Sequence, residues 1–142
     1  MVICRTTADI DAPAQRVWNA LAAVDAWPQW LPTVRSVEAL DGMPLEVGKR
    51  FRVTQPKLRP AVWVVEVVEP GRRFLWRVRS PGMRMTGDHV VESAGPSAAR
   101  AILGFAFEGI VGVLLGKLYG PLTRGYIEQE ARALKAVAEA TD

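Results

Sequence analysis

The chain has 142 residues, 49% of them hydrophobic, and its 18 basic and 15 acidic side chains give a formal net charge of +3. This length predicts one domain, residues 1–142, that can bury a hydrophobic core without help from disulfides. The basic side chains are scattered rather than gathered into a stripe, which argues against nucleic acid as a partner.

Cys4 is the only cysteine and His89 the only histidine. These counts exclude an internal disulfide, a multi-cysteine metal site and a histidine-rich zinc site, so no metal and no cofactor are expected. No signal-peptide pattern is present, and the most apolar stretch, residues 101–116, is shorter than the roughly 20 residues of a bilayer span. We therefore expect a cytoplasmic protein without stable membrane insertion.

The N-terminal third predicts one strand followed by two short helices. Residues 2–11 alternate between the two sides of a half-buried strand. An apolar pattern at helical spacing follows Pro13 and predicts a helix that ends near Asp25. Two prolines leave room for only a short second helix, and we expect its Trp27 and Trp30 to pin the helices to the rim of a sheet.

The middle of the chain predicts six more strands. Short segments of alternating apolar and polar residues are separated by turns rich in glycine and proline. Sequential strands joined by turns favour an antiparallel meander. The segments are residues 34–40, 50–55, 61–68, 73–79, 83–92 and 98–107.

The C-terminal stretch, residues 118–140, predicts a long helix with one apolar face. Pro121 is expected to break or kink it, so that the firm helix begins near this residue. Before it, the unusually apolar segment 104–120 carries Gly112, Gly116 and Gly120 at a spacing of four. This spacing allows a close backbone approach, but it could also leave volume for a ligand.

Several motifs resemble one known superfamily over nearly the whole chain. The motifs are IDAPAQRVWNAL at 10–21, WPQW at 27–30, EPGRRFLW at 69–76, GDH at 87–89 and ALKAVAE at 133–139. With these motifs the sequence is similar to the SRPBCC (START-like, Bet v 1-like) superfamily, and within it to the polyketide cyclase/dehydrase-like branch.

The resemblance implies an α+β helix-grip fold. In that fold a curved antiparallel sheet of about seven strands, two short helices and a long C-terminal helix enclose a cavity. The implied partner is a hydrophobic small molecule such as a lipid or a polyketide. One fold carries many activities, so the resemblance alone does not decide between binding and catalysis.

Candidate ligand-binding residues lie on the expected inward face of the strands, at the end of the last strand and on the long helix. His89 is the candidate catalytic residue, because an imidazole titrates near neutral pH. Glu108 is expected either to anchor a ligand at the cavity mouth or to lie exposed in a loop, and Arg100 is its possible ion-pair partner. The full set is Phe51, Trp63, Trp76, Met85, His89, Arg100, Glu108, Tyr119 and Tyr126.

Three functions remain open from the sequence. The first is binding, or binding and transport, of a hydrophobic small molecule in the cavity. The second is a cyclase or dehydratase reaction in the same cavity, with His89 as general acid or base, assisted by Glu108 or a tyrosine. The third is a protein-interaction module in which the apolar segment 109–122 contacts a partner or a second copy in a homodimer.

Overall fold

The computed structural model describes residues 1–140, which form one seven-stranded sheet, two α-helices and a 3₁₀ helix. Every neighbouring pair of strands is antiparallel. In chain order the elements are β1 (Val2–Ile10), α1 (Ala14–Ala22), η1 (Val24–Gln29), β2 (Ser36–Ala39), β3 (Arg50–Thr54), β4 (Ala61–Glu69), β5 (Arg73–Ser80), β6 (Met83–Ser93), β7 (Ala99–Glu108) and α2 (Ile110–Ala140).

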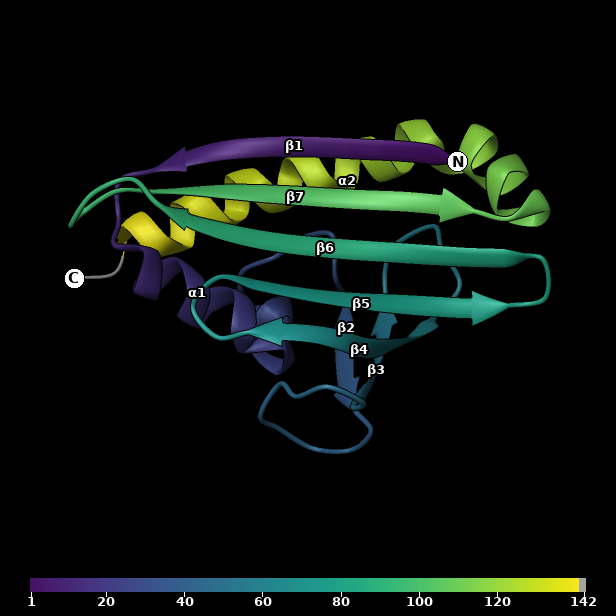
Figure 1. Ribbon diagram of the computed structural model, residues 1–142, viewed down its shortest axis with the longest axis horizontal. Coiled ribbons are helices and arrows are strands. Elements are labelled where there is room, and N and C mark those ends of the chain that lie inside the picture. The colour runs from purple at the N-terminus through teal and green to yellow at the C-terminus, as the bar shows by residue number, and fades with distance from the viewer. Residues whose placement is uncertain (141–142) are drawn as a thin grey trace.

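The sheet order is β1-β7-β6-β5-β4-β3-β2, so β2 to β7 form the predicted meander (Figure 1). The first strand joins the last one, in a register that runs from Val2 opposite Phe107 to Ile10 opposite Ala99. The α+β helix-grip architecture expected from the sequence is confirmed.

The sheet is curved, so that one of its faces is concave. The register between β4 and β5 shifts between Val65 and Val67, which marks an irregularity that bends a strand. Beyond it, β2 and β3 run across the direction of β5 to β7, whereas the end of β4 runs alongside β5 (Figure 1). The alternation of β3 to β6 places Phe51, Trp63 and Trp76 on the inner face, where each is at most 5% exposed.

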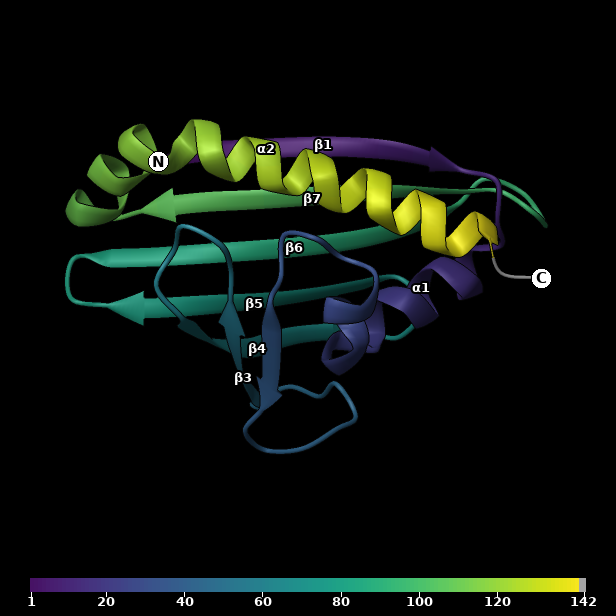
Figure 2. The same cartoon turned by 180° about the vertical axis from the view of Figure 1, so that it is seen from behind.

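The long helix α2 covers only part of this concave face. Within residues 1–140 it packs against β1, β7, β6 and α1 and has no close backbone contact with β2 to β5. The helices α1 and η1 lie at the end of the sheet near the C-terminus of α2 (Figure 2). The long helix α2 therefore leaves the inner side of β3 to β5 uncovered.

The prediction that the firm helix begins near Pro121 is wrong, because α2 begins at Ile110 and continues through this proline. A proline inside a helix removes one backbone hydrogen bond, which can bend a helix without ending it. Figure 2 shows that the first turns of α2 lie at an angle to the rest of the helix.

The glycines at the start of α2 differ in what surrounds them. A Cβ atom on Gly116 would lie 2.8 Å from the Val2 Cβ and 3.0 Å from the Phe107 Cβ, whereas one on Gly120 would meet no atom within 4 Å. The close backbone approach that the glycine spacing suggested is therefore confirmed at Gly116, where the helix crosses β1 and β7. Gly120 has open space instead.

Replacing Gly116 with Ala should lower the free energy of unfolding by about 1 kcal/mol, because forcing a methyl group into a packed contact outweighs the gain in helix propensity. The matched control is Gly120→Ala on the same helix, which should raise stability by about 0.5–1 kcal/mol. Chemical denaturation of both variants measures the difference. Equal effects of the two substitutions would contradict the close contact at Gly116.

Candidate functional site

A cavity of about 970 Å³ lies between α2 and the uncovered part of the concave face. This volume is near the upper end of the roughly 300–1,000 Å³ of sites for small organic ligands. Its walls are mostly apolar and include Trp27, Trp63, Trp76, Met85, Leu103 and Phe105.

Trp76 is the centre of an aromatic cluster on the cavity wall. Its ring centroid lies 5.5 Å from that of Trp63, which is stacked with it, and 5.4 Å from that of Trp27. Trp27 donates a hydrogen bond from Nε1 to the Leu21 carbonyl oxygen over 3.0 Å. The expectation that Trp27 sits at the sheet rim is therefore wrong, because the 3₁₀ turn of η1 directs this indole into the middle of the concave face.

His89 lies on β6 at the same cavity wall and is 5% exposed. Its ring stacks on Phe74 with centroids 4.0 Å apart, and its Nδ1 atom is 3.3 Å from the Phe74 carbonyl oxygen. Because a carbonyl only accepts, Nδ1 carries the hydrogen and Nε2 keeps its lone pair. Burial lowers the pKa of His89 to about 4, against the opposing effects of the Phe74 carbonyl and Asp88, so the imidazole is neutral at neutral pH.

Glu130 reaches the cavity from α2 and faces this lone pair. Its Oε1 atom is 3.7 Å from Nε2 of His89, is buried and has no hydrogen-bond partner. Burial raises the pKa of Glu130 to about 7, so a large share of this carboxyl is protonated at neutral pH. The gap is longer than a hydrogen bond, so each group retains a free hydrogen-bonding site that faces the cavity.

Glu130 is not among the site residues predicted from the sequence, although the sequence contains a signal for it. Ile127, Ala131 and Leu134 form the apolar inward stripe of α2. Glu130 lies three residues after Ile127 and four before Leu134, so it falls on the same face. An acid inside an apolar stripe is costly to bury and is therefore a candidate functional residue.

Most of the sequence-derived candidates come together at this cavity. Besides His89, five of them line it: Trp63, Trp76, Met85, Tyr119 and Tyr126. The Tyr126 hydroxyl donates a hydrogen bond to the Pro56 carbonyl oxygen, which connects α2 to the loop between β3 and β4. Phe51 is fully buried behind Trp76, with ring centroids 6.0 Å apart, and does not belong to the cavity wall.

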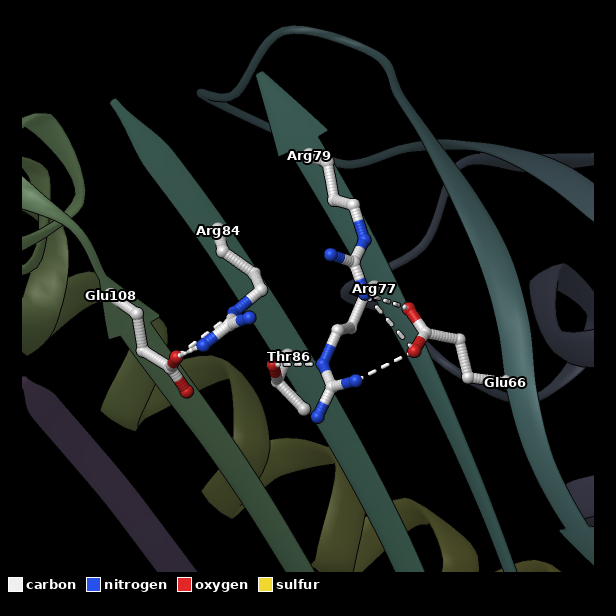
Figure 3. A network of polar contacts seen from close by, with 6 residues as sticks. All are labelled: Glu66, Arg77, Arg79, Arg84, Thr86 and Glu108. Carbon is white, nitrogen blue, oxygen red and sulfur yellow. Dashed lines mark hydrogen bonds and ion pairs between the residues drawn. The ribbon is translucent and has the colours of Figure 1, made fainter. Parts of the chain in front are cut away.

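The other two candidates, Arg100 and Glu108, do not line the cavity, and the ion pair expected between them is wrong. Arg100 pairs with Asp9 over 3.1 Å, and Glu108 pairs with Arg84 (Figure 3). The two residues are eight positions apart on β7, which at about 3.3 Å per residue separates them by roughly 26 Å. Equal strand parity placed them on one face but at opposite ends.

The ion pair of Glu108 with Arg84 lies beside a separate charged network of Glu66, Arg77, Arg79 and Thr86 on the outer face of the sheet (Figure 3). Arg77 and Arg79 in this network both bind the Glu66 carboxylate, over 2.6 and 3.0 Å. Arg77 is opposite in strand parity to Trp76, which explains why the network faces away from the cavity core. Arg79 also touches the cavity rim, but its guanidinium is held by Glu66.

The apolar segment 109–122 is largely exposed on the first turns of α2. Ile110 is 84% exposed, Leu118 70% and Leu114 62%. Only Leu115 and Tyr119 of this segment contribute to the cavity wall. Contact with a partner or a second copy through this segment stays a prediction.

Two kinds of feature are absent from residues 1–140. None of the helices there combines the length and the hydropathy needed to cross a bilayer. No group of three or more His, Cys, Asp and Glu side chains in the same residues is arranged to hold a metal ion.

Comparison with known proteins gives one family match. Residues 1–139 match the model of the family described as polyketide cyclase / dehydrase and lipid transport. A search of curated protein sequences finds no match.

Solved structures with the same fold include an enzyme. The Zhui aromatase/cyclase from Streptomyces sp. R1128 superposes with a TM-score of 0.77 at 18% identity, covering 96% of this chain and 93% of that one. A START superfamily protein from Mycobacterium smegmatis gives 0.74 at 17% identity over 98% of both chains. A protein from Thermus thermophilus gives 0.74 at 22% identity, covering 98% of this chain and 99% of that one. At these identities the likeness concerns the fold.

The raised pKa of Glu130 makes stability depend on pH in a defined direction. The folded chain holds this proton up to about pH 7, whereas the ordinary pKa of a glutamate is 4.5. The free energy of unfolding should therefore fall as the pH rises from about 4.5 to about 7. Glu130→Gln should remove this loss, so that its stability relative to the natural chain increases by about 2 kcal/mol across that window.

Urea denaturation at a series of pH values measures this difference. Glu128→Gln, an exposed position on the same helix, controls for loss of a helix carboxylate. The lowered pKa of His89 also makes the free energy of unfolding depend on pH, but this contribution is present in all three chains and cancels when they are compared. Parallel stability curves for the natural chain and Glu130→Gln would show that Glu130 is not desolvated.

Proposed function

Because the chain belongs to the polyketide cyclase/dehydrase and lipid transport family, we propose that it binds a hydrophobic small molecule, such as a lipid or a polyketide, in the cavity under α2. The observation that carries this proposal is the large cavity walled by Trp27, Trp63 and Trp76. A plain structural core would fill this volume with side chains.

Apolar burial would supply most of the binding free energy, at about 25 cal/mol for each Å² removed from water. Flat indole rings suit this task, because they offer a large apolar area with few rotatable bonds. The few polar groups on the wall, His89 and Glu130 among them, would fix the orientation of the ligand. Transport of the ligand belongs to the same proposal.

Filling the cavity should abolish binding without unfolding the protein. Met85 lies on the wall and is only partly buried, so Met85→Trp would direct the larger side chain into empty space. We expect affinity for a neutral hydrophobic dye such as Nile red to fall at least about tenfold, because the volume left for the ligand shrinks.

The control is Leu114→Trp, which adds the same side chain at an exposed position outside the cavity wall. It should leave dye binding unchanged. Dye fluorescence titration and native mass spectrometry of purified protein measure both variants. Equal dye binding by the natural chain and Met85→Trp would overturn the proposal that the cavity is the binding site.

The facing pair of His89 and Glu130 favours a second candidate function, acid–base catalysis on a polyketide-like substrate. A neutral imidazole can accept a proton at Nε2, and a protonated carboxyl can donate one, so the pair provides a base and an acid in one dry site. In an aldol cyclisation, Nε2 would remove a proton from the carbon between two carbonyl groups. The resulting carbanion would attack the carbon of a further carbonyl group of the substrate, and Glu130 would protonate the oxygen of that group.

This second candidate predicts a bell-shaped pH profile for turnover. His89 must be unprotonated, which requires a pH above about 4, and Glu130 must be protonated, which requires a pH below about 7. His89→Gln and Glu130→Gln should each reduce turnover of a linear poly-β-ketone thioester by about 100-fold or more. Nile red affinity should change little.

Chromatography of the remaining thioester measures turnover, and dye titration measures binding in the same samples. Full turnover in both variants would exclude this pair as the catalytic group. Absence of turnover in the natural chain, with dye binding intact, would leave the binding function alone.

A further inference from the structure

The loop between β3 and β4, residues 55–60, forms part of the cavity wall at its open side, and we call it the mouth loop. Its sequence, QPKLRP, contains Lys57 and Arg59 between two prolines. Both cations are exposed and both contribute to the cavity lining. The cavity therefore has positive charge at its edge, beside an apolar interior.

These two cations have no carboxylate partner among residues 1–140. Arg79, the other basic side chain of the cavity lining, is neutralised by Glu66 over 3.0 Å. Neither Lys57 nor Arg59 forms such an ion pair with a described side chain. Their charge is left available to a bound molecule.

The backbone conformation at position 57 of the mouth loop is unfavourable for a lysine. Lys57 has a φ of 66°, a left-handed conformation that glycine or asparagine adopts at lower cost. Residues held in such conformations cluster at ligand sites. The Tyr126 hydroxyl, which donates to the Pro56 carbonyl oxygen, holds the loop against α2 and so keeps both cations at the mouth.

The interior of the cavity disfavours an anionic group. Glu130 lies there with a buried oxygen that has no hydrogen-bond partner, and an anionic head group beside it would lose its water without gaining a cation in exchange. Among the described residues that line the cavity, the favourable place for an anion is therefore the mouth loop, where water screens the charge and two cations attract it.

We infer that the ligand is an anionic amphiphile, whose apolar body lies against the tryptophan wall and whose carboxylate or phosphate head group is bound by Lys57 and Arg59. This inference rests on the proposed binding function and deepens it. It names the chemical class of the ligand and its orientation, with the anionic head group at the mouth loop and the rest of the molecule inside the cavity.

Four probes with the same twelve-carbon chain test it: dodecanoate, dodecyl phosphate, dodecanol and dodecyltrimethylammonium. Binding is followed by the fluorescence of the cavity tryptophans at about pH 8 and low salt. Both anions should bind roughly three to ten times more tightly than dodecanol, and the cation more weakly, as two exposed ion pairs allow. Added salt should reduce this preference.

The double variant Lys57→Glu with Arg59→Glu should lose the preference for both anions and keep its affinity for dodecanol. Its control reverses the same number of charges elsewhere, through Arg72→Glu with Arg132→Glu, at two exposed positions outside the cavity wall. This control should bind like the natural chain. A third variant, Lys57→Gly, removes one charge while relaxing the backbone, and should bind the anions more weakly without losing stability.

The outcomes separate the two proposals. Tight dodecanol binding without any preference for anions, unchanged by the mouth-loop variants, would overturn the inference and leave the binding function standing. Failure of the natural chain to bind all four probes would count against both. A preference for dodecyl phosphate over dodecanoate, or the reverse, identifies which anionic head group the mouth loop recognises.

Discussion

The structure depends on a mismatch between the area of the concave sheet face and the area that one helix can cover. The close contact at Gly116 draws α2 against β1 and β7, so the helix lies over one side of the sheet. The inner faces of β3 to β5 still carry large apolar side chains such as Trp63 and Trp76. A volume of about 970 Å³ remains between them, and apolar surface around such a volume favours an apolar guest.

Desolvation then sets the charge states inside this volume. The same burial that lowers the pKa of His89 raises the pKa of Glu130, so both groups prefer their neutral forms. The neutral imidazole of His89 can accept a proton and the protonated carboxyl of Glu130 can donate one, and the two groups lie 3.7 Å apart. Because both are neutral, the wall is compatible with an apolar ligand as well as with proton transfer to and from that ligand. The proposed binding and the proposed catalysis would therefore use one arrangement of side chains.

In the described part of the chain, basic side chains are paired with carboxylates on the outer face of the sheet but not at the mouth loop. On the outer face, cations and carboxylates such as Arg77 and Glu66 are paired side by side and so offer little net charge to a partner. At the mouth loop, Lys57 and Arg59 have no such partner among the described side chains. The proposed orientation of an anionic amphiphile rests on this difference, because an anionic end would gain attraction only at the mouth.

The sequence by itself determined the seven strands, the meander and the inward face of residues such as Trp63, Trp76 and His89, because alternation and turn residues are local properties of the chain. It misjudged the start of α2, since packing against β1 and β7 keeps the helix intact on both sides of Pro121. Glu108 pairs with Arg84 rather than Arg100 because the register of β6 with β7 places Arg84 opposite it. Glu130 meets His89 because of the way α2 lies across the sheet. Only the tertiary structure decided these contacts, because residues far apart in the chain meet where packing, and not local pattern, brings them together.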